Sequence, residues 1–76
     1  METKISIVIV NLNTKELTLG CLRSIEKYSK GIFFEVLLTD NGSTDGSVEA
    51  IKKLSTEKFW KGKITLSLNS SNTGYA

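Results

Sequence analysis

Three apolar stretches, separated by two amphipathic ones, set the pattern of this chain. Residues 5–10 are almost continuously apolar and β-branched, which predicts a strand buried on both faces of a parallel sheet. Residues 32–39 predict a second strand of similar character. Residues 64–68 alternate strictly between apolar and polar positions, which predicts a half-exposed strand at a sheet edge.

The segment between the first two strands has the period of an amphipathic helix. We expect this helix to begin at Asn13 as its N-cap, with Glu16 completing a capping box, and to close at Gly31. Leu19 falls outside its predicted apolar stripe. The stripe itself consists of Leu17, Cys21, Leu22, Ile25 and Tyr28.

A second helix of about three turns is predicted after the second strand. Its apolar residues, Val48, Ile51 and Leu54, recur every three positions. Either Ser43 or Thr44 is expected to cap it. The aromatic residues that follow, at positions 59 and 60, are expected to cover one end of the core.

The element order is therefore β-α-β-α-β, an α/β fold. Right-handed crossovers, and the tendency of such sheets to wind outward from the first strand, give a parallel sheet with strand order 3-2-1, which is half of a three-layer, doubly wound, Rossmann-like sheet. In this order the most apolar strand, residues 5–10, has an open edge. We therefore expect residues 1–76 to be a single half-domain, the amino-terminal part of a larger domain. Pairing of two copies through the open edge is a further expectation.

Polar segments follow all three strands, at residues 11–14, 40–45 and 69–76. Because the strands are predicted to be parallel, these segments emerge at one rim of the sheet, where open α/β sheets bind ligands. A carboxylate such as Asp40 accepts hydrogen bonds from a ribose or a base, and a helix N-terminus favours phosphate. The rim thus suits a nucleotide. The simpler reading, a turn followed by a helix cap, is open on composition alone.

Several other sites are excluded by specific residues. The first strand is not followed by a G-x-G-x-x-G sequence, and no P-loop is present. A calcium loop over residues 41–52 would need glutamate where Lys52 stands. A phospho-receiver would need acidic residues after the first strand, where the chain has Asn11 and Asn13. Histidine is absent, which removes the commonest metal ligand and general base.

Composition adds little that is specific. The net charge of +2 is too small to indicate nucleic acid. Cys21 has no partner for an internal disulfide and is expected to be buried, and the first apolar run is too short for a signal peptide or a membrane span. A cytoplasmic protein is expected. The lysines around the aromatic residues at 59–60 are more readily explained as a solvated face than as a membrane contact.

Four segments carry a resemblance to a known family. They are residues 7–15 (IVIVNLNTK), 21–25 (CLRSI), 39–47 (TDNGSTDGS) and 69–76, which contains Asn69 and the sequence NTGYA. Together they resemble the opening of a bacterial family 2 glycosyltransferase, most closely the rhamnosyltransferase-like branch. Two residues depart from the family pattern. Leu12 stands where an aromatic residue is usual, which removes a base-stacking contact, and Thr39 replaces an aliphatic residue.

The resemblance implies a GT-A fold whose amino-terminal half binds the nucleotide of a nucleoside-diphosphate sugar. The implied function is inverting transfer of a sugar, rhamnose among the candidates, to a cell-surface polysaccharide. The metal-binding D-x-D motif, which would hold Mg²⁺ or Mn²⁺, and the catalytic base are implied to lie beyond Ala76, so this chain is expected to bind donor without catalysing. The implied nucleotide-binding residues are Asn11, Leu12, Asn13, Asp40, Asn41, Asp45, Asn72 and Gly74.

Two alternatives stay open beside this interpretation. The same β-α-β-α-β unit could serve as a non-catalytic scaffold or interaction module, which nucleotide binding dependent on Asp40 would distinguish. A nucleotide-sugar pyrophosphorylase would need a glycine-rich loop after the first strand, and residues 11–15 contain no glycine. For the parent enzyme, association with the inner face of a membrane is a further expectation.

Overall fold

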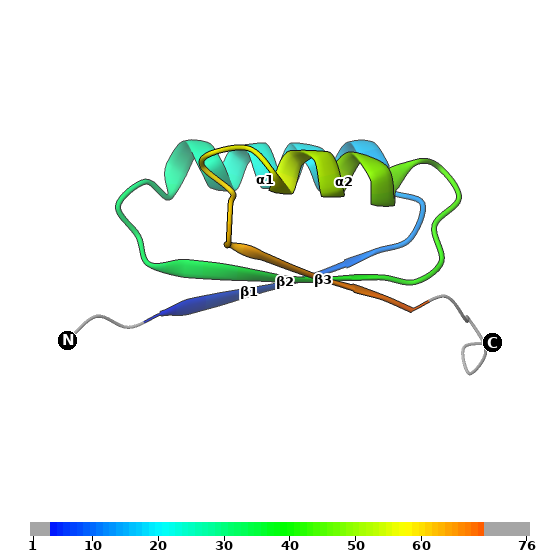
Figure 1. The fold of residues 1–76 in the computed structure, drawn as a ribbon, viewed down its shortest axis with the longest axis horizontal. Coiled ribbons are helices and arrows are strands. Elements are labelled where there is room, and N and C mark those ends of the chain that lie inside the picture. Colours follow the sequence, from blue (N-terminus) through cyan, green and yellow to red (C-terminus); the bar gives the residue numbers. More distant parts are fainter. Residues whose placement is uncertain (1–3, 70–76) are drawn as a thin grey trace.

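The computed structural model describes residues 4–69, and it confirms the predicted element order. Along the chain come strand β1 (Ile5–Asn11), helix α1 (Lys15–Tyr28), strand β2 (Phe34–Asp40), helix α2 (Ser47–Ser55) and strand β3 (Ile64–Leu68). The three strands are parallel and lie in the order β1-β2-β3, which confirms the expected sheet. Both helices cover the same face of the sheet (Figure 1), as two right-handed crossovers in one direction require.

The core lies between the sheet and the two helices. Trp60, in the turn after α2, is fully buried, and its ring packs edge-on against those of Phe34 and Phe59 at centroid distances of 6.0 and 5.1 Å. The expectation that these aromatics cover one end of the core is confirmed. The buried apolar residues are Leu22, Phe34, Val36, Leu38, Ile51, Leu54 and Trp60.

The predicted stripe of α1 is only partly correct. Leu22 is buried and Ile25 packs against the core, but Leu17 and Tyr28 are exposed, at 76% and 74%. The buried position beside Leu22 is instead Thr18. A helix on one face of a three-stranded sheet buries only a narrow stripe of its surface. Relative to the predicted stripe, the buried stripe of α1 is rotated toward Thr18 and Leu19.

Three further expectations for α1 are wrong. Cys21 is exposed rather than buried, and Leu19, which was placed outside the stripe, packs against the core. The helix also ends at Tyr28, three residues before Gly31, which adopts the left-handed conformation in the following loop (φ +86°). The burial of Leu19 and the exposure of Cys21 follow from the rotation of the helix about its axis.

Both predicted helix caps are also wrong. The N-cap of α1 is Thr14, not Asn13, because Asn13 adopts a left-handed conformation (φ +52°) that turns the chain sharply before the helix. The N-cap of α2 is Gly46 (φ +85°), not Ser43 or Thr44. Neither cap residue makes a side-chain capping bond. The polar side chains that sequence assigned to capping are used elsewhere, in contacts between the two loops.

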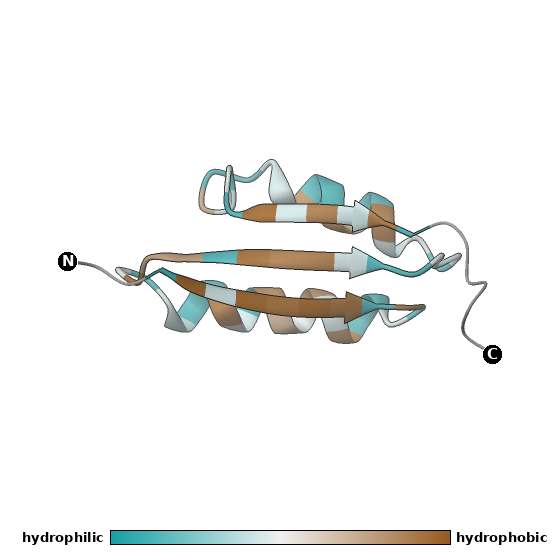
Figure 2. Cartoon of the chain, turned by 90° about the horizontal axis from the view of Figure 1, so that it is seen from below, coloured by the Kyte–Doolittle hydropathy of each residue, from teal (hydrophilic) through white to brown (hydrophobic). Residues whose placement is uncertain are grey.

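Strand β1 is not buried on both faces. Its residues that point away from the helices are open, and Val8 is 70% exposed. Figure 2 shows this uncovered face, on which β1 is the most hydrophobic strand. In the part of the chain that the structure describes, β2 is the only strand paired with β1, so the predicted open edge is present. β3 alternates between half-buried and exposed positions at the other edge, as expected.

The second strand begins two residues later than predicted. Ile32 and Phe33 lie in the loop before β2 and are exposed, and the strand extends one residue further, to Asp40. That extension matters for the site because it places Asp40 in register with Asn11, the last residue of β1.

Candidate functional site

The ends of the three strands lie at one rim of the sheet, as predicted. Asp40 pairs in register with Asn11 on one side and with Leu68 on the other. The backbone pairing continues past the strand ends, since the N–H of Asn41 donates to the carbonyl of Asn11 (3.0 Å) and that of Asn69 to the carbonyl of Asp40 (2.8 Å). The loops after all three strands therefore start side by side.

Asp40 is a buried carboxylate, 3% exposed, that accepts four hydrogen bonds. Its Oδ1 accepts from the side-chain amide of Asn11 (2.6 Å) and the hydroxyl of Ser43 (2.6 Å). Its Oδ2 accepts from the backbone N–H groups of Gly42 (3.1 Å) and Ser43 (2.9 Å). A carboxylate that bonds to its own backbone two and three residues on closes a tight turn. Asp40 thus fixes the path of the loop that follows β2.

These hydrogen bonds also decide the charge of Asp40. Burial by itself opposes ionisation, but the bonds from Ser43, Asn11 and Gly42 outweigh it, so the pKa of Asp40 lies below its usual value. The group is ionised at neutral pH without a cation beside it in the described part of the chain.

The depressed pKa of Asp40 predicts a loss of stability in acid. An aspartate carboxyl in an unfolded chain titrates at about pH 3.9, so the contribution of Asp40 is complete above that pH and is lost as pH falls through the lower folded pKa. We expect the difference in free energy of unfolding between the wild type and Asp40→Asn to shrink between pH 5 and 2. Urea denaturation at several pH values measures it. A difference that stays constant over that range would contradict the assignment.

Asn13 links the loop after β1 to the loop after β2. Its backbone N–H donates to the hydroxyl of Ser43 (2.9 Å), and its side-chain oxygen accepts from the backbone N–H of Thr44 (2.8 Å). The left-handed backbone of Asn13, which asparagine tolerates better than most residues, directs both groups toward the second loop. The hydroxyl of Ser43, which also bonds to Asn11 and Asp40, is the shared point of the two loops.

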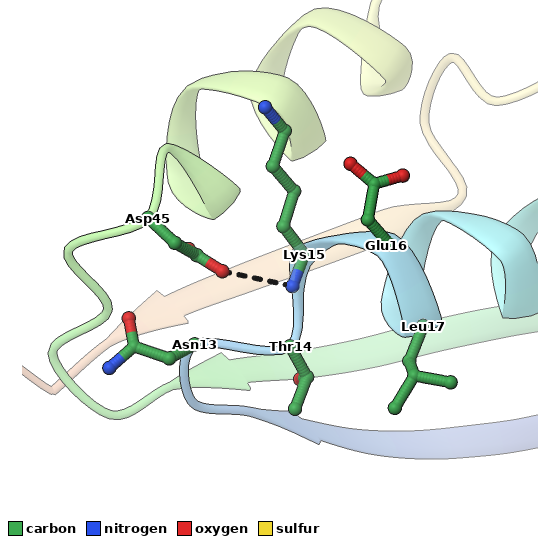
Figure 3. Close-up of a pocket in the computed structure, with 6 residues that line it drawn as sticks. All are labelled: Asn13, Thr14, Lys15, Glu16, Leu17 and Asp45. Carbon is green, nitrogen blue, oxygen red and sulfur yellow. Dashed lines mark hydrogen bonds between the residues drawn. The ribbon is translucent and has the colours of Figure 1, made fainter.

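Asp45 joins the starts of the two helices. Its carboxylate accepts from the backbone N–H of Lys15, the first residue of α1 (3.0 Å; Figure 3), and from the N–H (3.0 Å) and hydroxyl of Ser47, the first residue of α2. The bonds from Ser47 and Lys15 hold the pKa of Asp45 below its usual range. Asp45 therefore accepts hydrogen bonds from N–H groups at the start of both helices, a capping role that the side chains of the N-cap residues do not fill.

Two hollows flank these loops. The larger, of about 460 Å³, lies at the start of α1 and is lined by Asn13, Thr14, Lys15, Glu16, Leu17 and Asp45 (Figure 3). The ammonium of Lys15 extends from it toward α2, 3.6 Å from the position that a Cβ on Gly46 would take. The smaller, of about 180 Å³, lies between α2 and the end of β3 and is lined by Asp40, Gly42, Ser43, Val48, Leu68 and Asn69.

The structure brings together most of the residues expected at the site. Asn11, Asn13 and Asp40 share one hydrogen-bond network through Ser43, and Asp45 bonds separately to the starts of the two helices. Asn41 is half-buried beside Asn69, whose amide nitrogen lies 3.4 Å from the side-chain oxygen of Asn41. Leu12 is exposed at the turn after β1. Asn72 and Gly74 lie outside the described residues.

Sequence reasoning missed two residues of this network. Ser43 was considered only as a helix cap, although a serine three positions after an aspartate at a strand end is typical of a side-chain-stabilised turn. Thr18 was not considered at all, yet it is buried and its hydroxyl bonds to Asn11 (2.6 Å). A threonine on the buried side of a helix is the signal that could have found it.

The residues present do not fit a divalent cation. Within residues 4–69 no three histidine, cysteine, aspartate or glutamate side chains are grouped so that they could hold a metal ion. Both oxygens of Asp40 and both of Asp45 are already used by N–H and O–H donors.

The fold and the rim place the chain among the open α/β proteins that bind ligands at the carboxyl ends of parallel strands. A family model described as glycosyl transferase family 2 matches residues 6–76. The chain belongs to that family, so the expected family and α/β fold are confirmed, together with glycosyl transfer as the general activity. Comparisons with curated proteins and with solved structures gave no match.

Proposed function

We propose that this chain is the nucleotide-binding half-domain of an inverting glycosyltransferase that uses a nucleoside-diphosphate sugar as donor. Membership of glycosyl transferase family 2 supports the donor class. The observation that carries the proposal is the ionised, buried Asp40, which holds the loop at the carboxyl rim in one shape before any ligand binds. Such preorganisation reduces the entropy that binding would otherwise cost.

The candidate residues divide into two groups by exposure. Asn11 and Asp40 are buried and their polar groups already have partners, which favours an indirect role in which they hold the loops. Direct contact between Asp40 and a ribose or base stays a prediction. Asn13 and Asp45 are exposed and Asn41 is half-buried, so we propose that these residues, with the exposed Leu12, line the nucleotide pocket.

The finer details of the activity are proposed from the resemblance to the rhamnosyltransferase-like branch. The transferred sugar is proposed to be a hexose or rhamnose and the acceptor a growing bacterial cell-surface polysaccharide. A catalytic base must deprotonate the acceptor hydroxyl, and both it and the Mg²⁺ or Mn²⁺ that would stabilise the leaving diphosphate are assigned to residues beyond this chain. This chain is therefore proposed to bind donor without transferring sugar.

The cellular location is proposed on the same resemblance. Within residues 4–69 no helix is long and apolar enough to cross a bilayer. We propose a cytoplasmic enzyme, with the parent protein at the inner face of the membrane.

Calorimetric titration with UDP, dTDP and GDP tests the proposal, with inorganic phosphate as a control for simple anion binding. We expect saturable binding of at least one nucleotide, a ranking among the three bases, and no comparable binding of phosphate. Asn41→Ala should weaken that binding, whereas Lys30→Ala, an exposed change between α1 and β2, should not. Equal responses to all three nucleotides and to phosphate would contradict a nucleotide site.

A second candidate function is a scaffold or interaction module. One observation favours it: in the part of the chain that the structure describes, every buried side-chain nitrogen and oxygen has a hydrogen-bond partner, so the rim is complete without a ligand. A folded protein that binds none of the three nucleotides would favour this function.

We also propose that two copies pair through the open edge of β1. Among residues 4–69 no strand pairs with the outer edge of β1, and Val8 and Val10 add exposed apolar surface beside this edge. We expect the sedimentation coefficient of the wild type to rise with concentration, and the double substitution Val8→Lys and Val10→Lys to suppress the rise through charge at the edge. A wild type that stays monomeric at high concentration would rule out the pairing.

A further inference from the structure

The side-chain amide of Asn11 is held in one orientation by a carboxylate and three hydroxyl groups. Its oxygen accepts hydrogen bonds from the hydroxyls of Thr18 (2.6 Å) and Thr14 (2.9 Å), while its nitrogen donates to Asp40 Oδ1 (2.6 Å) and Ser43 Oγ (3.0 Å). Each polar atom of the amide therefore has two partners. The whole side chain is buried, with no exposed surface.

Turning the amide of Asn11 by about 180° would place an acceptor against an acceptor. The amide oxygen would then face the ionised carboxylate of Asp40, and the amide nitrogen would face hydroxyls that already donate toward it. The carboxylate of Asp40 can only accept, so it determines that Asn11 presents its N–H groups to it, and the two threonine hydroxyls support that orientation by donating to the amide oxygen. The donor from Asn11 acts together with the bonds from Ser43 and Gly42, which lower the pKa of Asp40 and keep the buried carboxylate aligned with the N–H groups of its loop.

Threonine is unusual at a buried helix position such as that of Thr18 unless its hydroxyl makes a hydrogen bond. It lies in the second turn of α1, is 5% exposed, and stands beside the core residue Leu22 on the helix. Threonine is a weak helix former, and a buried helix position ordinarily favours an aliphatic residue. Its hydroxyl bonds to a residue seven positions earlier rather than only within its own helix. The contact ties α1 to the network of the rim.

We propose that Thr18 is a positioning residue for the nucleotide site. It acts through Asn11 and Asp40 on the loop that carries Asn41, and it touches no ligand itself. This inference rests on the proposed function, because the consequence it predicts is a change in nucleotide affinity. The chain of contacts from Thr18 to the loop consists of hydrogen bonds of 2.6, 2.6 and 2.9 Å.

The test compares Thr18→Val, which keeps the shape and removes the hydroxyl, with Thr18→Ser, which keeps the hydroxyl. Each is titrated with whichever of UDP, dTDP and GDP binds the wild type most tightly. We expect Thr18→Val to weaken binding about tenfold, the effect of losing one hydrogen bond in a buried charged network, and Thr18→Ser to stay within about twofold of the wild type. Rescue by serine distinguishes the hydroxyl from the methyl packing.

A second readout needs no ligand and separates this inference from the proposed function. The side-chain N–H signals of Asn11 in the free protein should be slow to exchange with solvent in the wild type and in Thr18→Ser, and fast in Thr18→Val. If slow exchange persists in Thr18→Val, or if serine and valine weaken binding equally, the inference is overturned. If the wild type binds no nucleotide although the exchange pattern is as expected, the proposed function fails while Thr18 keeps its role in ordering the loop.

Discussion

Asp40→Ala is expected to remove nucleotide binding and to lower the free energy of unfolding by about 2 to 4 kcal/mol. The substitution removes the acceptor of four hydrogen bonds at a buried site. Their donors are the side-chain amide of Asn11, the backbone N–H groups of Gly42 and Ser43, and the hydroxyl of Ser43. Without that acceptor the loop after β2 loses the turn that presents Asn41. Urea denaturation and calorimetric titration measure the two effects on the same samples.

Two further variants control this result. Glu49→Ala removes an exposed carboxylate in the first turn of α2 and should change stability by only a few tenths of a kcal/mol. Asp40→Asn keeps the volume but places an amide nitrogen against N–H donors, so its loss should be intermediate. An Asp40→Ala protein with wild-type stability and affinity would refute the role assigned to this carboxylate.

Trp60→Ala is expected to be the most destabilising single change in the core, by about 3 to 5 kcal/mol. A chain of 76 residues has a total stability of roughly 4 to 11 kcal/mol, so much of the variant should be unfolded. The cause is the cavity left between Phe34, Phe59 and α1, against which the fully buried indole packs. Circular dichroism during thermal unfolding measures the loss.

Another aromatic residue provides the matched control. Phe33 lies just before β2 and is 51% exposed, so Phe33→Ala should cost less than about 1 kcal/mol. Trp60→Phe should fall between the two, because it keeps an aromatic ring but removes the indole N–H bond to Glu26 (3.3 Å). A Trp60→Ala protein that melts within a few degrees of the wild type would show that this end of the core is not needed for stability.

The strand order was predictable from the sequence because it depends on general geometry. Apolar stretches of strand length alternate with helical periods, and the handedness of parallel crossovers, together with the tendency of such sheets to wind outward from the first strand, then favours one arrangement. The rim followed from the same argument, since parallel strands end on one side. The apolar pattern of β1 did not show which of its faces are covered. An apolar side chain can lie on a buried or on an open face, and the pattern alone does not say which elements pack against the strand.

The helix stripe and the site network were harder to predict, for one shared reason. Thr18 counts as polar in a periodicity argument, so the stripe was assigned through Leu17, which is exposed. Thr18 can be buried because its hydroxyl bonds to Asn11. Asn11 in turn bonds to Asp40, which lies 29 positions after Asn11 in the sequence. Hydrogen bonds between residues so far apart depend on the strand register, which a local pattern does not contain.

The central claim is that a nucleoside diphosphate binds at the carboxyl rim of this sheet, on the loops that Asp40 and Ser43 hold together. Backbone amide NMR spectra of the labelled chain, recorded during titration with the tightest-binding nucleotide, test it most directly. We predict saturable shifts at residues 11–15 and 40–47, with little change at Lys30, Glu49 and the uncovered face of β1. Shifts centred on the helices or the opposite rim, or a folded spectrum unchanged by UDP, dTDP and GDP, would contradict the account.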